Sequence, residues 1–282
     1  MELLFYYFLI FFIYSIFGWM IETINCSIMA KKKILNRGFL IGPYIPIYGT
    51  GALVMILFLT EYKKDPFVLF CMAVVYCSLI EYITSYLMEK LFLARWWDYT
   101  HEKFNLNGRI CLKNSLLFGV LGVILMYVIH PSVELLLAKV PSNILVTISY
   151  IAFLIFFLDI IVTILLLAKL DIEIKNIKSD ATEEIDKEMK KLLIHFRVLY
   201  KRLFKAFPKI NINTERGNML IDRIRSQLDE FDDLIEKKKK EIASIKEKIK
   251  KLKDDNLTKE KLIKEKEKLK NNLKEVKKRK IK

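Results

Sequence analysis

The segment RWWDYTHEKFNLNGRICL (residues 95–112) is a short polar connection between two long apolar runs. It is rich in charged and amide side chains, and two adjacent tryptophans stand near its start. Tryptophan is enriched where a membrane-spanning helix meets the headgroup region of a bilayer. The segment therefore indicates a loop at the surface of a membrane domain, with a span on either side of it.

Apolar runs close to the ~20 residues that cross a hydrocarbon core occur throughout the first part of the chain. We predict an all-α membrane bundle of about five spans, at residues 3–29, 43–59, 67–93, 111–129 and 143–168. The second run opens with GPYIPIYGTG, which contains two prolines and three glycines. Such a sequence also fits a re-entrant segment, so four spans with a re-entrant second run is the alternative.

The charged residues divide the chain into two domains. Residues 1–168 hold 12 basic and 10 acidic side chains, whereas residues 169–282 hold 35 and 22. This contrast predicts a transmembrane domain at 1–168 and a soluble appendage at 169–282. Basic residues follow the first, third and fifth runs, so the positive-inside rule places the N-terminus outside and the tail in the cytoplasm.

The second domain has a helical pattern. Apolar residues from Ile185 to Leu203 and from Leu220 to Leu252 recur mostly at spacings of three and four, around a turn in FPKININTERGN. This predicts a cytoplasmic antiparallel coiled-coil hairpin followed by a basic helical tail. Interspersed charges of both signs argue against nucleic acid as a partner; contact with anionic lipid is an alternative to a solvated surface. Homo-oligomerisation stays open.

Several carboxylates fall inside the predicted spans, where an unpaired charge costs about 3 kcal/mol or more. Glu81 and Glu89 are eight residues apart and share one helix face. Arg95 and Arg109 bracket the polar loop, and a guanidinium satisfies a buried carboxylate well, so we expect one of them to pair with a glutamate of that face. The candidates for a polar site at the cytoplasmic side are Glu22, Asn36, Arg37, Glu81, Glu89, Arg95, Asp98, Asn105 and Arg109.

Such a cluster locks helices together, binds a transported substrate or performs catalysis. Catalysis is least favoured, because no nucleophile stands beside a base and His101 is the only histidine near the cluster. We predict no enzyme activity, no cofactor and no metal site. The glycine-rich start of the second run would present free backbone N–H groups to an anion beside Arg37, or would simply begin a tightly packed helix.

Four stretches carry a family resemblance: GWMIE (18–22), NRGFLIGPYIPIYGTGAL (36–53), EYITSYLMEKLF (81–92) and the polar segment 95–112. Together they resemble a bacterial family of integral membrane proteins described as "putative ABC-transporter type IV" and also labelled ABC transporter permeases. The resemblance covers residues 1–135. It implies a multi-span protein of the bacterial inner membrane that takes part in transport.

The sequence contains no Gly-x-x-x-x-Gly-Lys-[Ser/Thr] motif, the loop that binds nucleotide phosphates in P-loop ATPases. A permease of this sequence therefore needs a separate ATP-binding subunit. Two other functions remain open. One is a membrane-anchored scaffold whose coiled-coil tail recruits partners, and the other is a membrane-embedded enzyme that acts on lipid headgroups.

Overall fold

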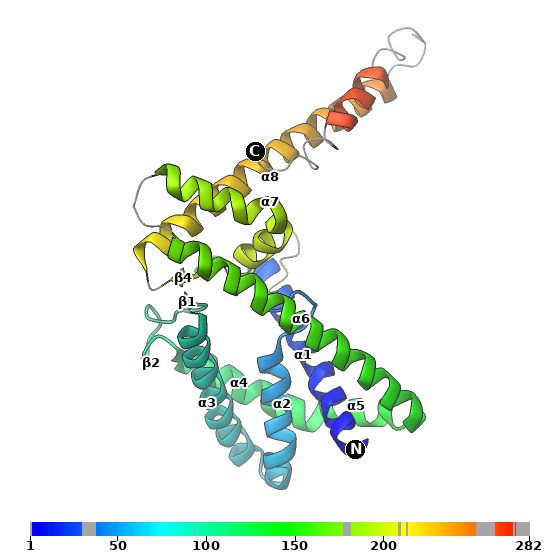
Figure 1. Ribbon diagram of the computed structural model, residues 1–282. Coiled ribbons are helices and arrows are strands. Elements are labelled where there is room, and N and C mark those ends of the chain that lie inside the picture. The colour runs from blue at the N-terminus through cyan, green and yellow to red at the C-terminus, as the bar shows by residue number, and fades with distance from the viewer. Residues whose placement is uncertain are drawn as a thin grey trace. The chain divides into compact units, whose positions relative to one another are not determined.

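The computed structural model describes residues 2–29, 38–92, 94–176, 182–207, 210–212, 214–251, 263–272 and 274. Helices make up nearly all of this part of the chain, so the predicted all-α class is confirmed (Figure 1). The elements are, in chain order, α1 (Glu2–Met29), α2 (Pro46–Leu59), η1 (Thr60–Lys64), α3 (Pro66–Phe92), β1 (Ala94–Arg95), β2 (Asn105–Leu106), β3 (Ile110–Cys111), α4 (Leu112–Ile124), η2 (Leu125–Ile129), α5 (His130–Leu137), α6 (Ser142–Asn176), α7 (Thr182–Ala206), β4 (Asn211–Ile212) and α8 (Glu215–Lys251).

Four stretches of the described helices are long and apolar enough to cross a membrane: Leu3–Ile28, Pro66–Phe92, Leu112–Leu137 and Ser142–Lys175. They correspond to the first, third, fourth and fifth predicted runs, and the protein is a multi-pass membrane protein. The third of them passes from α4 to α5 through the π-helical turn η2. Pro131 has no N–H to donate to the carbonyl one turn back, which explains a local widening of the helix here.

The second predicted run forms a shorter helix. α2 has 14 residues, which at 1.5 Å per residue span about 21 Å, less than the ~30 Å of a hydrocarbon core. The helix begins at Pro46, because a proline is tolerated in the first turn and its ring fixes φ. In Figure 1, α1, α2 and α3 alternate in direction, so α2 and η1 connect the ends of the two longer helices. Whether α2 counts as a fifth span stays a prediction.

Small side chains let α1 and α2 approach closely. A Cβ atom on Gly49 would overlap the Ser15 hydroxyl and the carbonyl of Phe11, so only glycine fits at this crossing. Two apolar clusters complete the packing of α2. One joins α2 to α3 and η2 through Met55, Leu59, Leu69, Ala73 and Met126, and the other joins α1, α2 and α5 through Ile10, Tyr14, Ala52 and Val133.

The chain divides into two compact units, Met1–Asp171 with Arg202–Asn213, and Ile172–Lys201 with Thr214–Lys282. The first unit thus includes a return segment that the sequence-based boundary at 168/169 assigns to the tail. In the second unit the predicted stripe is buried at, among others, Ile185, Met189, Leu192, Leu220, Ile224, Leu228 and Ile245.

The antiparallel coiled coil itself is not confirmed. Arg223 pairs with Asp186, and Lys201 pairs with Asp232. The residue numbers of both partners increase from the first pair to the second, so α7 and α8 run in the same direction along these contacts. In an antiparallel hairpin, the number would increase on one helix and decrease on the other. Of the predicted final helix, residues 263–272 and 274 are helical, and Leu262, Leu273 and Val276 lie outside the described residues.

Labelling of single cysteines should report the crossing of α3. In a background with the four native cysteines replaced by alanine, Lys63→Cys in η1 should react with an impermeant maleimide in intact cells. Lys103→Cys should react only in inverted vesicles, because a 27-residue apolar helix separates the two positions. Lys240→Cys in α8 is the reference for the tail side. Labelling of Lys63→Cys and Lys103→Cys from the same side would contradict the topology.

Candidate functional site

The polar loop, residues 94–111, contains a tight hairpin. β2 and β3 are antiparallel, and the turn between them has φ angles of 55° at Asn107 and 67° at Gly108. The Arg109 N–H donates to the Leu106 carbonyl at 3.0 Å. Leu106 pairs with Ile110, so the hairpin loop has three residues, 107–109. Asn-Gly favours the β-turn at its centre, since both residues tolerate positive φ. The sequence LNGR therefore sets the shape of the loop.

Asp98 and Asn105, two of the predicted site residues, hold the backbone of the polar loop. Asp98 accepts hydrogen bonds from the Thr100 N–H at 3.0 Å and from its hydroxyl at 3.1 Å. The Asn105 amide donates to the carbonyls of Thr100 and Glu102 at 3.2 and 2.8 Å, and its oxygen accepts from the Gly108 N–H at 3.0 Å. These contacts give both side chains a structural role in the loop.

Glu89, near the end of α3, binds both arginines of the polar loop. Its Oε2 lies 2.9 Å from Arg109 Nη1 and 3.3 Å from Arg95 Nε. Arg95 also lies 3.6 Å from Asp98 Oδ1. The Arg109 side chain is 11% exposed and that of Glu89 is 20% exposed. The predicted pairing of loop arginines with a glutamate of α3 is thus confirmed for Glu89.

Arg109 is held by a second set of contacts on the same helix. It donates to Ser85 Oγ at 3.3 Å, and its guanidinium carbon lies 5.8 Å and 5.4 Å from the ring centroids of Tyr82 and Tyr86. Aromatic rings at this distance attract a cation. Asn107 adds a hydrogen bond of 2.9 Å to the Tyr82 hydroxyl. The polar loop is therefore fixed along more than one turn of α3.

Glu81 pairs with a tyrosine of the polar loop. The Tyr99 hydroxyl donates to Glu81 Oε1 at 3.2 Å. Burial raises the pKa of Tyr99 well above its usual range, and the Glu81 carboxylate raises it further, so the phenol stays protonated and remains a donor. Glu81 is only 6% exposed, and its Oε2 has no hydrogen-bond partner among the described residues.

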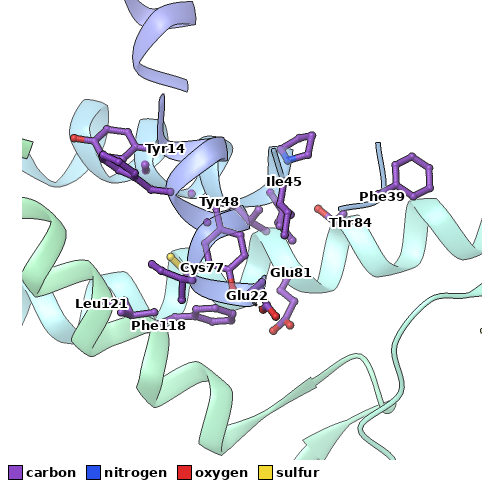
Figure 2. A pocket seen from close by; sticks show the side chains of 18 of the residues that line it. Tyr14, Glu22, Phe39, Ile45, Tyr48, Cys77, Glu81, Thr84, Phe118 and Leu121 are labelled. Carbon is purple, nitrogen blue, oxygen red and sulfur yellow. Dashed lines mark hydrogen bonds between the residues drawn. The ribbon is translucent and has the colours of Figure 1, made fainter. Parts of the chain in front are cut away.

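Glu22, on α1, lies near Glu81 of α3 (Figure 2). Its Oε1 accepts from the Tyr48 hydroxyl at 2.8 Å, and the Cys26 thiol lies 3.7 Å from its Oε2. Asn36 and Arg37, the remaining predicted site residues, lie outside the described residues.

Both glutamates line a cavity of about 700 Å³. Its wall comes from α1, α2, α3, α4 and α6 together with parts of the loops, and most of the lining side chains are apolar. Figure 2 shows the carboxylates of Glu22 and Glu81 close together on one side of the cavity, with Tyr48 directed at Glu22. The arrangement is an apolar chamber with a small acidic region.

The connection before α2 is organised by Asp159, which is 9% exposed on α6. Its carboxylate accepts from the backbone N–H groups of Ile41 at 2.8 Å and Gly42 at 2.6 Å. It also accepts from the hydroxyls of Tyr44 at 2.5 Å and Thr163 at 3.1 Å. The backbone N–H groups considered above as a site for an external anion therefore include two that bind a carboxylate of the protein itself.

The end of α7 and the chain after it return to this side of the first unit. Arg202 donates to the carbonyl of Leu40, and its Nη2 lies 3.4 Å from that of Gly38. β4 pairs with β1 in antiparallel register. The Trp96 and Phe207 rings meet edge to face with centroids 5.0 Å apart. We call residues 38–45, 94–111, 202–207 and 210–212 the polar cap.

Three of the residues that build this region, Tyr48, Tyr99 and Arg202, were not among the predicted site residues. Tyr99 lies inside the quoted polar segment and Tyr48 inside the glycine-rich run, so their hydroxyls were available as partners for the nearby glutamates. Arg202 lay within a stripe interpreted as coiled coil. The adjacent buried pair Leu203 and Phe204 departs from a two-residue-per-heptad pattern and was the one available signal.

No group of three or more His, Cys, Asp or Glu side chains in the described part of the chain is arranged to hold a metal ion. His130, at the start of α5, is 4% exposed and lies 3.1 Å from the Tyr14 hydroxyl and 3.5 Å from Glu134. Its contacts tie α1 to α5.

The first unit is therefore a multi-pass helical membrane domain with a structured polar cap and a largely apolar cavity that carries acidic groups. Residues 9–164 match the family described as "Putative ABC-transporter type IV", and the chain belongs to that family. Comparison with curated proteins and with solved structures gave no match. The family assignment and the apolar helices fit a component of a membrane transport system.

A double-mutant cycle should detect the ion pair between Arg109 and Glu89. Removing a hydrogen bond to a charged group costs about 1.5–3 kcal/mol, so Arg109→Gln and Glu89→Gln should each lower the melting temperature in detergent. The double variant should melt close to the worse single variant. The control cycle joins Arg109→Gln to Glu102→Gln, an exposed carboxylate of the same loop, and should be additive. Additivity in both cycles would exclude the pair.

A second variant should test the role of Asp159. Asp159→Asn keeps the shape of the side chain but places an N–H donor among four hydrogen-bond donors, so it should lower the melting temperature markedly. Thr163→Val removes one of these donors and should cost less, about 0.5–1.5 kcal/mol. Equal melting temperatures of the two variants would show that the carboxylate does not hold the connection before α2.

Proposed function

We propose that this chain is the membrane-spanning permease subunit of an ABC-type transport system and that its substrate passes through the cavity beside Glu22 and Glu81. The observation that carries the proposal is the cavity itself. It has a volume of about 700 Å³ and lies among the apolar helices of the first unit. Ionisable groups are expensive inside a membrane and mark substrate pathways in transporters.

Energy would come from a separate subunit, because the sequence has no P-loop motif. The polar loop is the surface we propose for contact with that subunit. Arg109 and Asn107 tie its hairpin to α3. Phe104, the residue before β2, is 80% exposed with φ of 54°. Exposed aromatic side chains on ordered loops are typical anchors of protein interfaces.

The orientation belongs to the same proposal. The polar loop carries Arg95, Lys103 and Arg109, and basic residues favour the cytoplasmic side of a bacterial inner membrane. The N-terminus then lies outside and the tail inside, where its net positive charge favours anionic lipid. We propose no catalytic chemistry for this chain itself.

The strongest competing function is a scaffold whose tail recruits partners. It is favoured by the size and charge of the second unit, in which α7 and α8 together present a long charged surface. A scaffold needs no cavity in the membrane domain, and the cavity is therefore the feature that ranks transport first.

Affinity purification in mild detergent should distinguish the two functions. The tagged chain should retain a P-loop ATPase, and the purified complex should hydrolyse ATP. Phe104→Ser should reduce the retained ATPase severalfold, because it removes the exposed anchor of the polar loop. Phe67→Ser is the matched control, since Phe67 is 74% exposed at the opposite end of α3. Partners held by residues 214–282 alone, without any ATPase, would favour the scaffold instead.

A further inference from the structure

The charged side chains that the structure describes along the cavity are acidic. Among the described residues that line it, Glu22 and Glu81 are the ionisable carboxylates, and no lysine, arginine or histidine joins them. The nearby arginines of the polar loop, Arg95 and Arg109, are bound to Glu89. An anionic ligand in this cavity would face two carboxylates with no compensating cation from these residues, whereas a cationic ligand would be attracted by both.

Glu81 shows which chemical group is missing. The residue is only 6% exposed, Oε1 accepts from Tyr99, and Oε2 has no hydrogen-bond partner among the described residues. A buried carboxylate oxygen without a donor is costly. In Figure 2 the Glu81 carboxylate extends toward that of Glu22. A ligand group that brings N–H donors and positive charge to this point would satisfy both glutamates.

The tyrosines cannot supply that group. The Tyr48 hydroxyl is used by Glu22, and the Tyr99 hydroxyl is used by Glu81. Each phenol has a single proton to donate. The remaining hydrogen-bonding capacity of the two carboxylates is therefore acceptor capacity, which an ammonium group fits and a carbonyl or a phosphate does not.

The rest of the cavity defines the body of the ligand. Its lining includes the aromatic rings of Tyr14, Phe17, Phe118 and Phe156, together with aliphatic side chains. Such walls favour an apolar ligand surface, and aromatic faces also attract a cation. The ligand would thus have a compact apolar body and one cationic nitrogen.

We propose that the cavity binds an apolar organic ammonium ion, whose N–H groups donate to Glu81 and Glu22 while its hydrocarbon part lies against the aromatic wall. This inference rests on the proposed function in that it names the substrate class of the same site. It concerns binding by the chain alone, so it can be tested without any ATPase.

Three probes with the same hydrocarbon cage separate charge from apolar contact: 1-adamantanamine, 1-adamantanol and 1-adamantanecarboxylate. Binding to the full chain in lipid nanodiscs is measured by isothermal titration calorimetry at neutral pH, with empty nanodiscs subtracted. The amine should bind at least tenfold more tightly than the alcohol. The carboxylate should show no saturable binding.

The variants assign the binding to the two carboxylates. Glu81→Gln should weaken amine binding at least tenfold and leave the affinity for the alcohol within twofold. Glu22→Gln gives an independent second test, with a smaller loss of affinity, since its carboxylate already has the Tyr48 hydroxyl. Glu61→Gln in η1 changes a carboxylate outside the cavity lining and should leave amine binding unchanged. Circular dichroism and melting temperature confirm that each variant is folded.

Equal affinity for the amine and the alcohol would overturn the proposal, as would tighter binding of the carboxylate. Amine binding that survives both Glu81→Gln and Glu22→Gln would overturn it as well. If the amine binds as expected but no ATPase is retained on purification, the ligand class stands and the permease function fails. If an ATPase is retained but the amine does not bind, the function stands and the ligand class fails.

Discussion

Hydrocarbon offers no hydrogen bonds. Every backbone N–H or C=O group that lies outside a helix near the membrane core therefore needs a partner inside the protein. The connection before α2 meets this requirement from both sides. Asp159 of α6 accepts from its N–H groups at Ile41 and Gly42, while Arg202 of α7 donates to its carbonyl at Leu40. A carboxylate and a guanidinium from distant parts of the chain thus fix the start of α2, and α2 in turn forms one wall of the cavity.

The carboxylates of the membrane helices differ in how fully they are satisfied. Asp159 accepts from four donors, and Glu89 binds two guanidinium groups. Glu81 accepts only from Tyr99 among the described residues, although it is the more deeply buried of the two α3 glutamates. An unsatisfied charge is costly in this environment. The contacts of Asp159 and Glu89 within the fold already satisfy their charges. Glu81 is the one whose cost a bound group would relieve.

The long spans and the contacts of the polar loop could be predicted from the sequence because both depend on residues close together in the chain. Apolar length predicted about five spans, four of which are long helices, and helical spacing placed Glu81 and Glu89 on one face. The start of α2 was harder to predict, since the run 43–59 holds a proline at both 43 and 46 and the helix begins at the second. The contacts of Arg202 and the pairing of β1 with β4 join residues more than 100 positions apart, and no pattern within either segment reports the other.

The polar loop acquires its density of hydrogen-bonding groups from two tasks that one hairpin performs. Within it, the Tyr99 N–H donates to the Gly108 carbonyl at 2.8 Å, so Tyr99 lies beside the residue that precedes Arg109. These neighbours contact Glu81 and Glu89, which are eight residues and about 12 Å apart on α3. The Asn-Gly turn fixes the position of Arg109, and Arg109 binds Glu89 at the end of α3. Because the hairpin is held there, Tyr99 beside it is placed to donate to Glu81. The loop thereby couples its own backbone geometry to the acidic region of the cavity.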